Sequence, residues 1–84
     1  MASVEQTYIY VGLGSEGGQE GHGLYRRPIS GGSWELKTHG LPENPDVRDL
    51  ALDPDNASIL LCGTQDGVYR TTNQADHWEK LPLP

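Results

Sequence analysis

The chain contains no phenylalanine and only one cysteine, Cys62, in 84 residues. A single cysteine excludes an internal disulfide framework and any zinc site built on cysteines. Hydrophobic residues make up 35% of the chain, and two tryptophans and four tyrosines supply all of its aromatic bulk. Because a chain this short buries a smaller fraction of its surface than a typical domain does, we expect a thin core that depends on further protein surface.

Basic residues are also scarce, with six lysines and arginines against 12 acidic residues and a formal net charge of −6. Apart from Arg26 and Arg27, the basic residues are scattered along the chain. We therefore expect neither nucleic acid nor a membrane surface as a partner, since both are bound by clustered positive charge. The opening residues, MASVEQT, are polar, and neither a signal peptide nor a spanning helix is visible. The sequence leaves the compartment unknown.

Turn-forming residues are abundant instead, with 11 glycines and 6 prolines. Short runs of strand-forming residues alternate with polar turn clusters, a pattern that predicts an all-β antiparallel fold. The predicted strands span residues 7–13, 23–26, 34–38, 47–52, 58–64, 68–72 and 78–81. A helix of any length is hard to place.

One glycine cluster spells a nucleotide-binding fingerprint. Residues 8–17 read YIYVGLGSEG, so Gly12, Gly14 and Gly17 follow a predicted strand at the spacing G-x-G-x-x-G. That fingerprint requires a helix to begin at its third glycine, because the helix N-terminus holds the pyrophosphate. Four glycines within residues 17–23 disfavour a helix, since each costs about 1 kcal/mol relative to alanine. We interpret residues 14–22 as a long loop between two strands, and expect no cofactor.

The sequence repeats itself. Gly23-Leu24-Tyr25-Arg26 matches Gly67-Val68-Tyr69-Arg70 at an offset of 44 residues, and Trp34-Glu35 matches Trp78-Glu79 at the same offset. Upstream, Tyr10-Val11-Gly12 pairs with Leu61-Cys62-Gly63 at an offset of 51, so the first copy carries a seven-residue insertion within residues 14–22. A period of this length with about four strands is typical of a β-propeller blade.

The second unit, VRDLALDPDNASILLCGTQDGVYRTTNQADHWEKL, resembles the bacterial neuraminidase repeat, or Asp-box, propellers, a superfamily that includes sortilin-like propellers. The resemblance rests on Asp53-Pro54-Asp55-Asn56, Gly63-Thr64, Gly67-Val68-Tyr69-Arg70 and Trp78, and it extends over residues 8–81. It implies antiparallel four-stranded blades, about two blade-equivalents per chain.

The Asp-box itself, Ser-x-Asp-x-Gly-x-x-Trp, is degenerate in both copies. The second copy has Thr71, Asn73 and Ala75 at the first three positions and keeps Trp78. In the first copy Arg27 and Ile29 replace Ser and Asp, whereas Gly31 and Trp34 are retained. The resemblance implies a structural turn whose acidic residue caps main-chain amides and whose tryptophan packs between blades. Asn73 can still cap and Ile29 cannot, so we expect a looser first box.

We divide the chain into a first, incomplete blade over residues 1–46, with the long loop at 14–22, and a second blade over 47–84. A blade cannot bury both of its faces alone, and stacked repeats need at least three units. The partner is therefore expected to be the chain itself, as a trimer or tetramer closed head to tail, or the remaining blades of a parent propeller. A first strand borrowed from a neighbour's terminus would help to close such a ring.

No residue pattern points to catalysis or to a metal. The three histidines have no metal-ligand spacing, and no nucleophile has an activating motif beside it. We assign structural box or turn roles to a first group of residues: Trp34, Trp78, Asn73, Gly31, Asp53, Asn56 and Gly67. Ligand or interface contacts are expected of four residues in the long loop: Glu16, Gln19, Glu20 and His22.

The predicted function is a non-catalytic structural or binding scaffold that self-associates. A lectin-like propeller that binds glycans is the alternative, and a fragment of a sialidase-like glycosidase is the third. We expect both Trp34 and Trp78 to lie in the core, because their fixed spacing belongs to the box.

Overall fold

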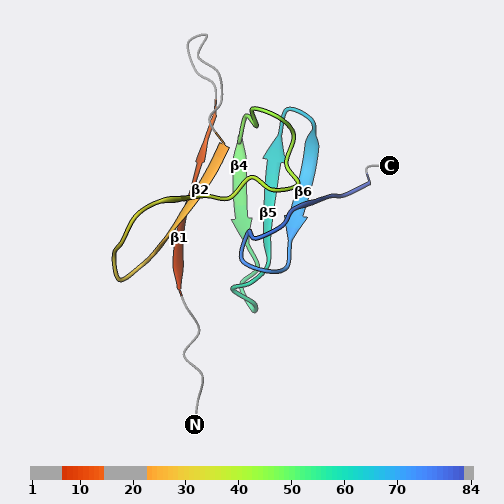
Figure 1. Ribbon diagram of the computed structural model, residues 1–84. Helices are drawn as coiled ribbons and strands as arrows, with labels where there is room; N and C mark the ends of the chain where they lie inside the picture. Colours follow the sequence, from red (N-terminus) through yellow and green to blue (C-terminus); the bar gives the residue numbers. More distant parts are fainter. Residues whose placement is uncertain (1–6, 15–22, 83–84) are drawn as a thin grey trace.

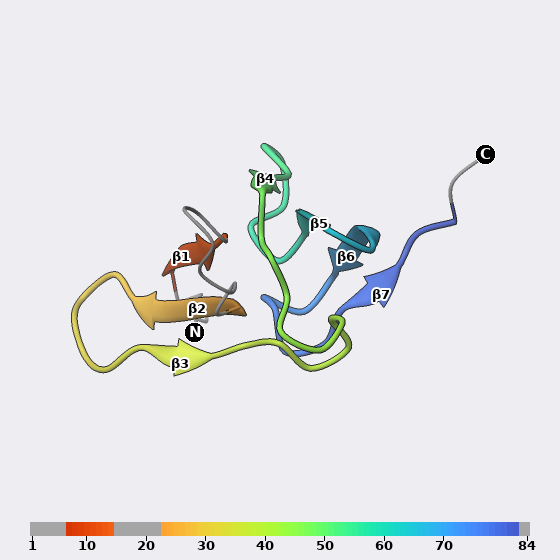
Figure 2. The same ribbon diagram turned by 90° about the horizontal axis from the view of Figure 1, so that it is seen from above.

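The computed structural model describes residues 7–14 and 23–82, and in these ranges the chain forms two antiparallel β-sheets and no helix. The two sheets stand side by side in Figure 1, and in the view from above they are joined by the connection that runs from β3 to β4 (Figure 2). The expected all-β antiparallel fold is therefore confirmed.

The first sheet has three strands in the order β1-β2-β3: β1 (Tyr8–Leu13), β2 (Gly23–Pro28) and β3 (Glu35–Leu36). The second has four in the order β4-β5-β6-β7: β4 (Asp49–Leu52), β5 (Leu60–Thr64), β6 (Gly67–Thr71) and β7 (Glu79–Lys80). Each strand pairs with the next along the chain, so both sheets are meanders.

All seven predicted strands are present within the described residues, although the outer ones are shorter than predicted. β3 covers two residues where residues 34–38 were predicted, and β7 covers two where residues 78–81 were predicted. Each of these strands lies at one edge of its sheet, and its ladder with its one neighbour among the described residues extends over two residue pairs.

The sequence repeat is preserved in the strand pairing. Arg26 lies opposite Glu35 in the first sheet, and Arg70 lies opposite Glu79 in the second. After the outer strands, the main-chain N–H of Lys37 donates to Leu24 O at 2.8 Å, and that of Leu81 donates to Val68 O at 2.8 Å. Strands β1 to β3 are therefore the counterparts of β5 to β7, and β4 has no counterpart among the described residues.

The core lies between the sheets and comes mostly from the second one. Leu60, Cys62 and Tyr69 alternate along β5 and β6 with exposed residues, as expected for strands with one buried face. The buried hydrophobic residues are Leu24, Val47, Leu60, Cys62, Tyr69, Ala75 and Trp78, with Tyr10, Leu41 and Leu50 packed against them. Leu24 is the only one of the seven buried residues that a strand of the first sheet supplies.

Gly12 has a packing role in the structure. A Cβ atom built on Gly12 would lie 2.2 Å from Val47 Cγ1, well inside contact distance. Any side chain at this position would push β1 away from the start of the second sheet. The first glycine of the apparent nucleotide fingerprint thus allows the two sheets to approach closely.

The β5–β6 hairpin turns through Gln65 and Asp66, between the paired residues Thr64 and Gly67. Gly67 takes a φ of +116°, which non-glycine residues rarely adopt. Thr64 Oγ1 accepts the N–H of Asp66 at 3.1 Å, and the Tyr69 hydroxyl donates to Asp66 Oδ2 at 2.7 Å. This short hairpin is the counterpart of the connection over residues 14–22, of which residues 15–22 lie outside the described ranges.

Candidate self-association faces

We call the contact between the two sheets the inter-sheet seam, and Arg26 is its central polar residue. The Arg26 side chain is only 9% exposed, yet it reaches from β2 to the turn between β6 and β7. Its Nη1 donates to Gln74 O at 2.5 Å and pairs with Asp76 Oδ1 at 3.1 Å, and its Nε pairs with Glu35 Oε2 at 3.3 Å. The guanidinium carbon lies 4.2 Å from the centre of the Tyr8 ring, within cation–π range.

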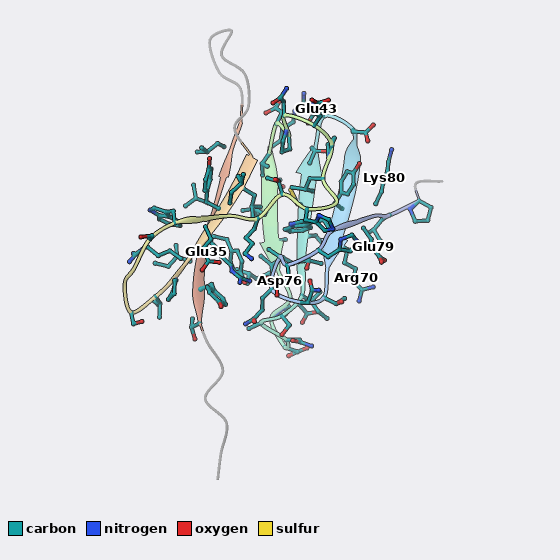
Figure 3. The ribbon with its side chains drawn as sticks, in the orientation of Figure 1. Glu35, Glu43, Arg70, Asp76, Glu79 and Lys80 are labelled. Atoms are coloured by element: carbon teal, nitrogen blue, oxygen red, sulfur yellow. The ribbon has the colours of Figure 1, made fainter. Side chains whose placement is uncertain are left out.

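Lys37 adds a second cation to this end of the seam. Its Nζ lies 3.0 Å from Asp76 Oδ1 and 3.6 Å from Glu35 Oε2. Figure 3 shows Glu35 beside the first sheet and Asp76 at the lower end of the second, facing the gap between them. The Lys37 hydrogen bond, together with the charges of Arg26 and Lys37, lowers the pKa of Asp76 below its usual value. The contacts of Arg26 and Lys37 with Asp76 join the two sheets with charge-assisted hydrogen bonds.

Trp78 closes the hydrophobic side of the seam. Its side chain is 1% exposed, and its indole Nε1–H donates to the main-chain carbonyl of Lys37 at 3.0 Å. The Trp78 main-chain N–H donates to His39 O at 2.9 Å. Trp78 therefore fills space between the sheets and also satisfies its polar atom on the first sheet, as buried tryptophans usually do.

The second box forms a hydrogen-bonded turn. Thr71 Oγ1 accepts the amides of Asn73 at 3.3 Å and Ala75 at 3.1 Å, and Asn73 Oδ1 accepts the amide of His77 at 3.0 Å. Gln74 and Ala75 take positive φ values of 60° and 73°. The turn presents the Gln74 carbonyl and Asp76 to Arg26, so its conformation sets the polar contacts of the seam.

The repeat identifies which faces remain open. In the first sheet, the face toward the seam carries Tyr10, Leu24 and Arg26, whose counterparts in the second sheet are Leu61, Val68 and Arg70. In the second sheet, the face toward the seam carries Cys62, Tyr69 and Trp78, whose counterparts in the first sheet are Val11, Tyr25 and Trp34. The two sheets therefore place non-equivalent faces in the seam. The equivalent of each seam face lies on the other sheet and is exposed.

We call the exposed face of the three-stranded sheet the first open face, formed by Val11, Leu13, Tyr25, Trp34 and Leu36. Val11 is 36% exposed, Trp34 46% and Leu36 57%, high values for large apolar side chains. A groove of about 330 Å³ is lined by Val11, Leu13, Tyr25 and Trp34. The Arg27 guanidinium lies 5.3 Å from the Trp34 ring centre, so the face has an apolar centre and one positive group.

We call the exposed face of the four-stranded sheet the second open face, formed by Ala51, Leu61, Val68, Arg70, Glu79 and Leu81. Leu61 is 40% exposed. Two grooves, of about 320 and 180 Å³, lie on this face, and Arg70 lines both of them. Figure 3 shows Arg70 and Glu79 on the side of the second sheet away from the first.

The expectation that Trp34 lies in the core is wrong for the single chain. Trp34 sits beside β3 as Trp78 sits beside β7, but no sheet among the described residues covers it, so it stays half exposed. The first turn is also built differently. β2 continues to Pro28, whereas its counterpart β6 ends at the residue equivalent to Arg27. Gly31, with a φ of +123°, bonds to Pro28 O, and Ile29 is 61% exposed.

The other predicted site residues have local roles or lie outside the described residues. Asp53 Oδ1 accepts the amides of Asp55 at 2.8 Å and Asn56 at 3.1 Å, and Asn56 Oδ1 accepts the amide of Ser58 at 2.9 Å, which caps the β4–β5 turn. The four loop residues Glu16, Gln19, Glu20 and His22 belong to the part of the chain that the structure leaves undescribed.

Two of the histidines meet, although their distance in the sequence suggested otherwise. The His39 and His77 ring centres are 5.0 Å apart, because the connection that follows β3 runs against the second box. Within the described ranges, no group of three or more His, Cys, Asp or Glu side chains is placed to hold a metal ion. None of the described residues forms a helix long and apolar enough to cross a membrane.

Cys62 lies fully buried in the core of the second sheet. Burial disfavours the thiolate and raises the pKa of Cys62 to about 11. The thiol is therefore protonated near neutral pH and behaves as a small apolar side chain in the core.

Searches of protein-family models, curated proteins and solved structures found no match to this chain. The features of the described residues that bear on function are the two open faces and the inter-sheet seam, which joins the equivalent pair of faces.

Proposed function

We propose that the chain is a non-catalytic, propeller-type structural module that associates head to tail with copies of itself. The first open face of one copy packs on the second open face of the next, and three or four chains close a ring. The resemblance to Asp-box propellers agrees with this arrangement, since about two blades per chain would give six or eight blades.

One observation carries the proposal: the molecule already contains one instance of this contact. In the seam, the face of the second sheet that carries Cys62, Tyr69 and Trp78 packs on the face of the first sheet that carries Leu24 and Arg26. The two open faces are the remaining equivalent pair. Two different but complementary faces at opposite sides of one chain give a heterologous contact, which generates rings or filaments.

The exposed area also favours association. An apolar face that includes Trp34 and Leu36 at 46% and 57% exposure is costly in water, at about 25 cal/mol for each Å² left uncovered. Contiguous apolar patches of this kind mark interaction sites. A second copy offers Leu61 and Val68 to cover it.

Light scattering on the purified chain tests the proposal. We expect a mass three or four times that of one chain at micromolar concentration. Leu61→Glu places a charge in the middle of the second open face and should reduce the mass to that of a single chain. Ala57→Glu adds the same charge on an exposed turn residue and is the matched control. A monodisperse, cooperatively folded monomer of the unchanged chain would contradict the proposal.

A glycan-binding module is the second candidate, and the first open face is what favours it. Tyr25 and Trp34 line an apolar groove beside Arg27, an arrangement on which a sugar ring can stack. Saturation transfer from a monomeric chain to soluble oligosaccharides would support this candidate over self-association. We attribute no catalysis to the chain.

A further inference from the structure

We propose that Trp34 anchors the contact between copies, with its indole N–H donating to the main-chain carbonyl of Leu81 in the neighbouring copy. This inference rests on the proposed head-to-tail association and assigns its register and its central hydrogen bond. A second contact joins Arg70 of that neighbour to the turn over residues 29–32 of the first copy.

The seam within one chain supplies the geometry. Trp78 is 1% exposed and donates from Nε1 to Lys37 O at 3.0 Å. The acceptor is a main-chain carbonyl just beyond the outer strand of the other sheet. The contact therefore depends on the position of the backbone and on no particular side chain at residue 37.

Trp34 and Leu81 occupy the same two positions in the repeat. Trp34 immediately precedes β3 as Trp78 precedes β7, and the paired residues Arg26 and Glu35 correspond to Arg70 and Glu79. Leu81 follows β7 as Lys37 follows β3, and both donate their N–H to the equivalent strand residue at 2.8 Å. The Leu81 carbonyl is thus held where the second open face needs an acceptor.

The surroundings of Trp34 fit such a partner. Trp34 is 46% exposed and forms one wall of the apolar groove of about 330 Å³. Leu24 packs into the seam in the core cluster with Trp78 and Tyr69, and its counterpart on the second open face is Val68. Docking of a neighbour would place Val68 over Tyr25 and Trp34 and remove the tryptophan from water.

The arginine contact is kept only in part. Arg26 bonds to Gln74 O at 2.5 Å and pairs with Asp76 at 3.1 Å. The residues equivalent to Gln74 and Asp76 are Ser30 and Gly32, which offer main-chain carbonyls but no carboxylate. The contact between copies therefore lacks the ion pair of the seam and is the weaker of the two, so copies separate before the two sheets of one chain do.

The experiment follows the indole N–H groups in a proton–nitrogen correlation spectrum of the ¹⁵N-labelled chain. The two tryptophans give two indole signals, and Trp34→Phe assigns them by removing one. We expect the Trp34 proton signal to move downfield and to exchange slowly with solvent as concentration rises, because it gains a hydrogen bond. The Trp78 signal should stay constant, since its bond to Lys37 is already made.

Association constants from light scattering complete the test. Trp34→Phe removes the N–H and part of the ring, and should weaken association roughly tenfold. Arg70→Gln should weaken it by a comparable factor. Arg48→Gln removes another exposed arginine, one that belongs to neither open face, and should leave the constant unchanged.

The outcomes separate the two proposals. If the unchanged chain stays monomeric at all concentrations, the proposed function fails and this inference fails with it. If the chain associates while the Trp34 signal stays fixed and Trp34→Phe binds as tightly as the unchanged chain, association stands and the assigned register is overturned. A Trp34 shift that follows the mass, together with the weakening by both variants, supports the inference.

Discussion

Trp34 and Trp78 show how one residue type at one position of a repeat takes on two environments. Both follow a polar turn and immediately precede a short outer strand. Trp78 is 1% exposed because the first sheet covers it, whereas Trp34 is 46% exposed in a single chain. The difference comes from the neighbouring sheet, because both tryptophans hold the same position directly before an outer strand.

Truncation of the two tryptophans should therefore have unequal effects on folding. Trp78→Ala should lower the free energy of unfolding by about 3–5 kcal/mol, the usual range for a buried tryptophan. Trp34→Ala should lower that of the dissociated chain by less than about 1 kcal/mol, as for most exposed substitutions. Urea unfolding at a concentration where the chain is monomeric measures both, and equal losses would contradict the assigned environments.

Asp76 makes the folded state sensitive to acid. The Lys37 hydrogen bond and the charge of Arg26 lower the pKa of Asp76 in the folded chain below its usual value. The stabilisation is therefore present above the unfolded pKa and is lost as pH falls through the lower folded value. Asp76→Asn should flatten the fall of unfolding free energy below about pH 4. Glu43→Gln removes an exposed carboxyl outside the seam and should keep the steeper fall.

At the scale of elements, the turn of the second box holds the seam together. Its side-chain hydrogen bonds position the Gln74 carbonyl and Asp76 for Arg26. The equivalent turn of the first sheet has Ile29 in place of the capping asparagine and is built on the Gly31–Pro28 bond. The two sheets are thus equivalent in their strands and different in this turn.

Loss of the Thr71 hydroxyl should destabilise the folded chain, because this hydroxyl holds the turn of the second box. Thr71 is 1% exposed, and its Oγ1 accepts two amides, so Thr71→Val leaves buried donors without their acceptor. We expect the free energy of unfolding to fall by about 1–3 kcal/mol. Thr72→Val changes the next, exposed residue in the same way and should have little effect. Guanidinium unfolding of the two variants gives the comparison, and similar values would argue against the role of the turn.

At the scale of the whole molecule, the arrangement of the two open faces decides the kind of assembly. Leu36→Glu blocks the first open face and Leu61→Glu blocks the second. In a head-to-tail assembly each variant alone should be monomeric, because one of the two complementary faces is charged. A mixture should form a complex of two chains and grow no further, since only one pair of intact faces remains. Sedimentation velocity distinguishes this result from a face that pairs with itself, where one variant alone would still dimerise.

The pattern of residues along the chain is enough to predict the strands and the repeat. Alternation of apolar and polar residues, with turn clusters between, predicted all seven strands within the described residues, and the spacing of Tyr25 to Trp34 and Tyr69 to Trp78 predicted the equivalence of the two sheets. Local propensity and period suffice for these features. The capping oxygens of Asp53, Asn56 and Asn73 were also predictable, because their partners lie two to four residues away.

Which faces of the sheets are covered depends on how the sheets pack against each other. The sequence repeats make Trp34 equivalent to Trp78 and Arg26 equivalent to Arg70, yet one member of each pair is buried and the other is exposed. The approach of Gly12 to Val47 and the contact of His39 with His77 also join residues more than 30 positions apart. Burial depends on which sheet lies against a face, and two sheets in one chain can cover only two of their four faces.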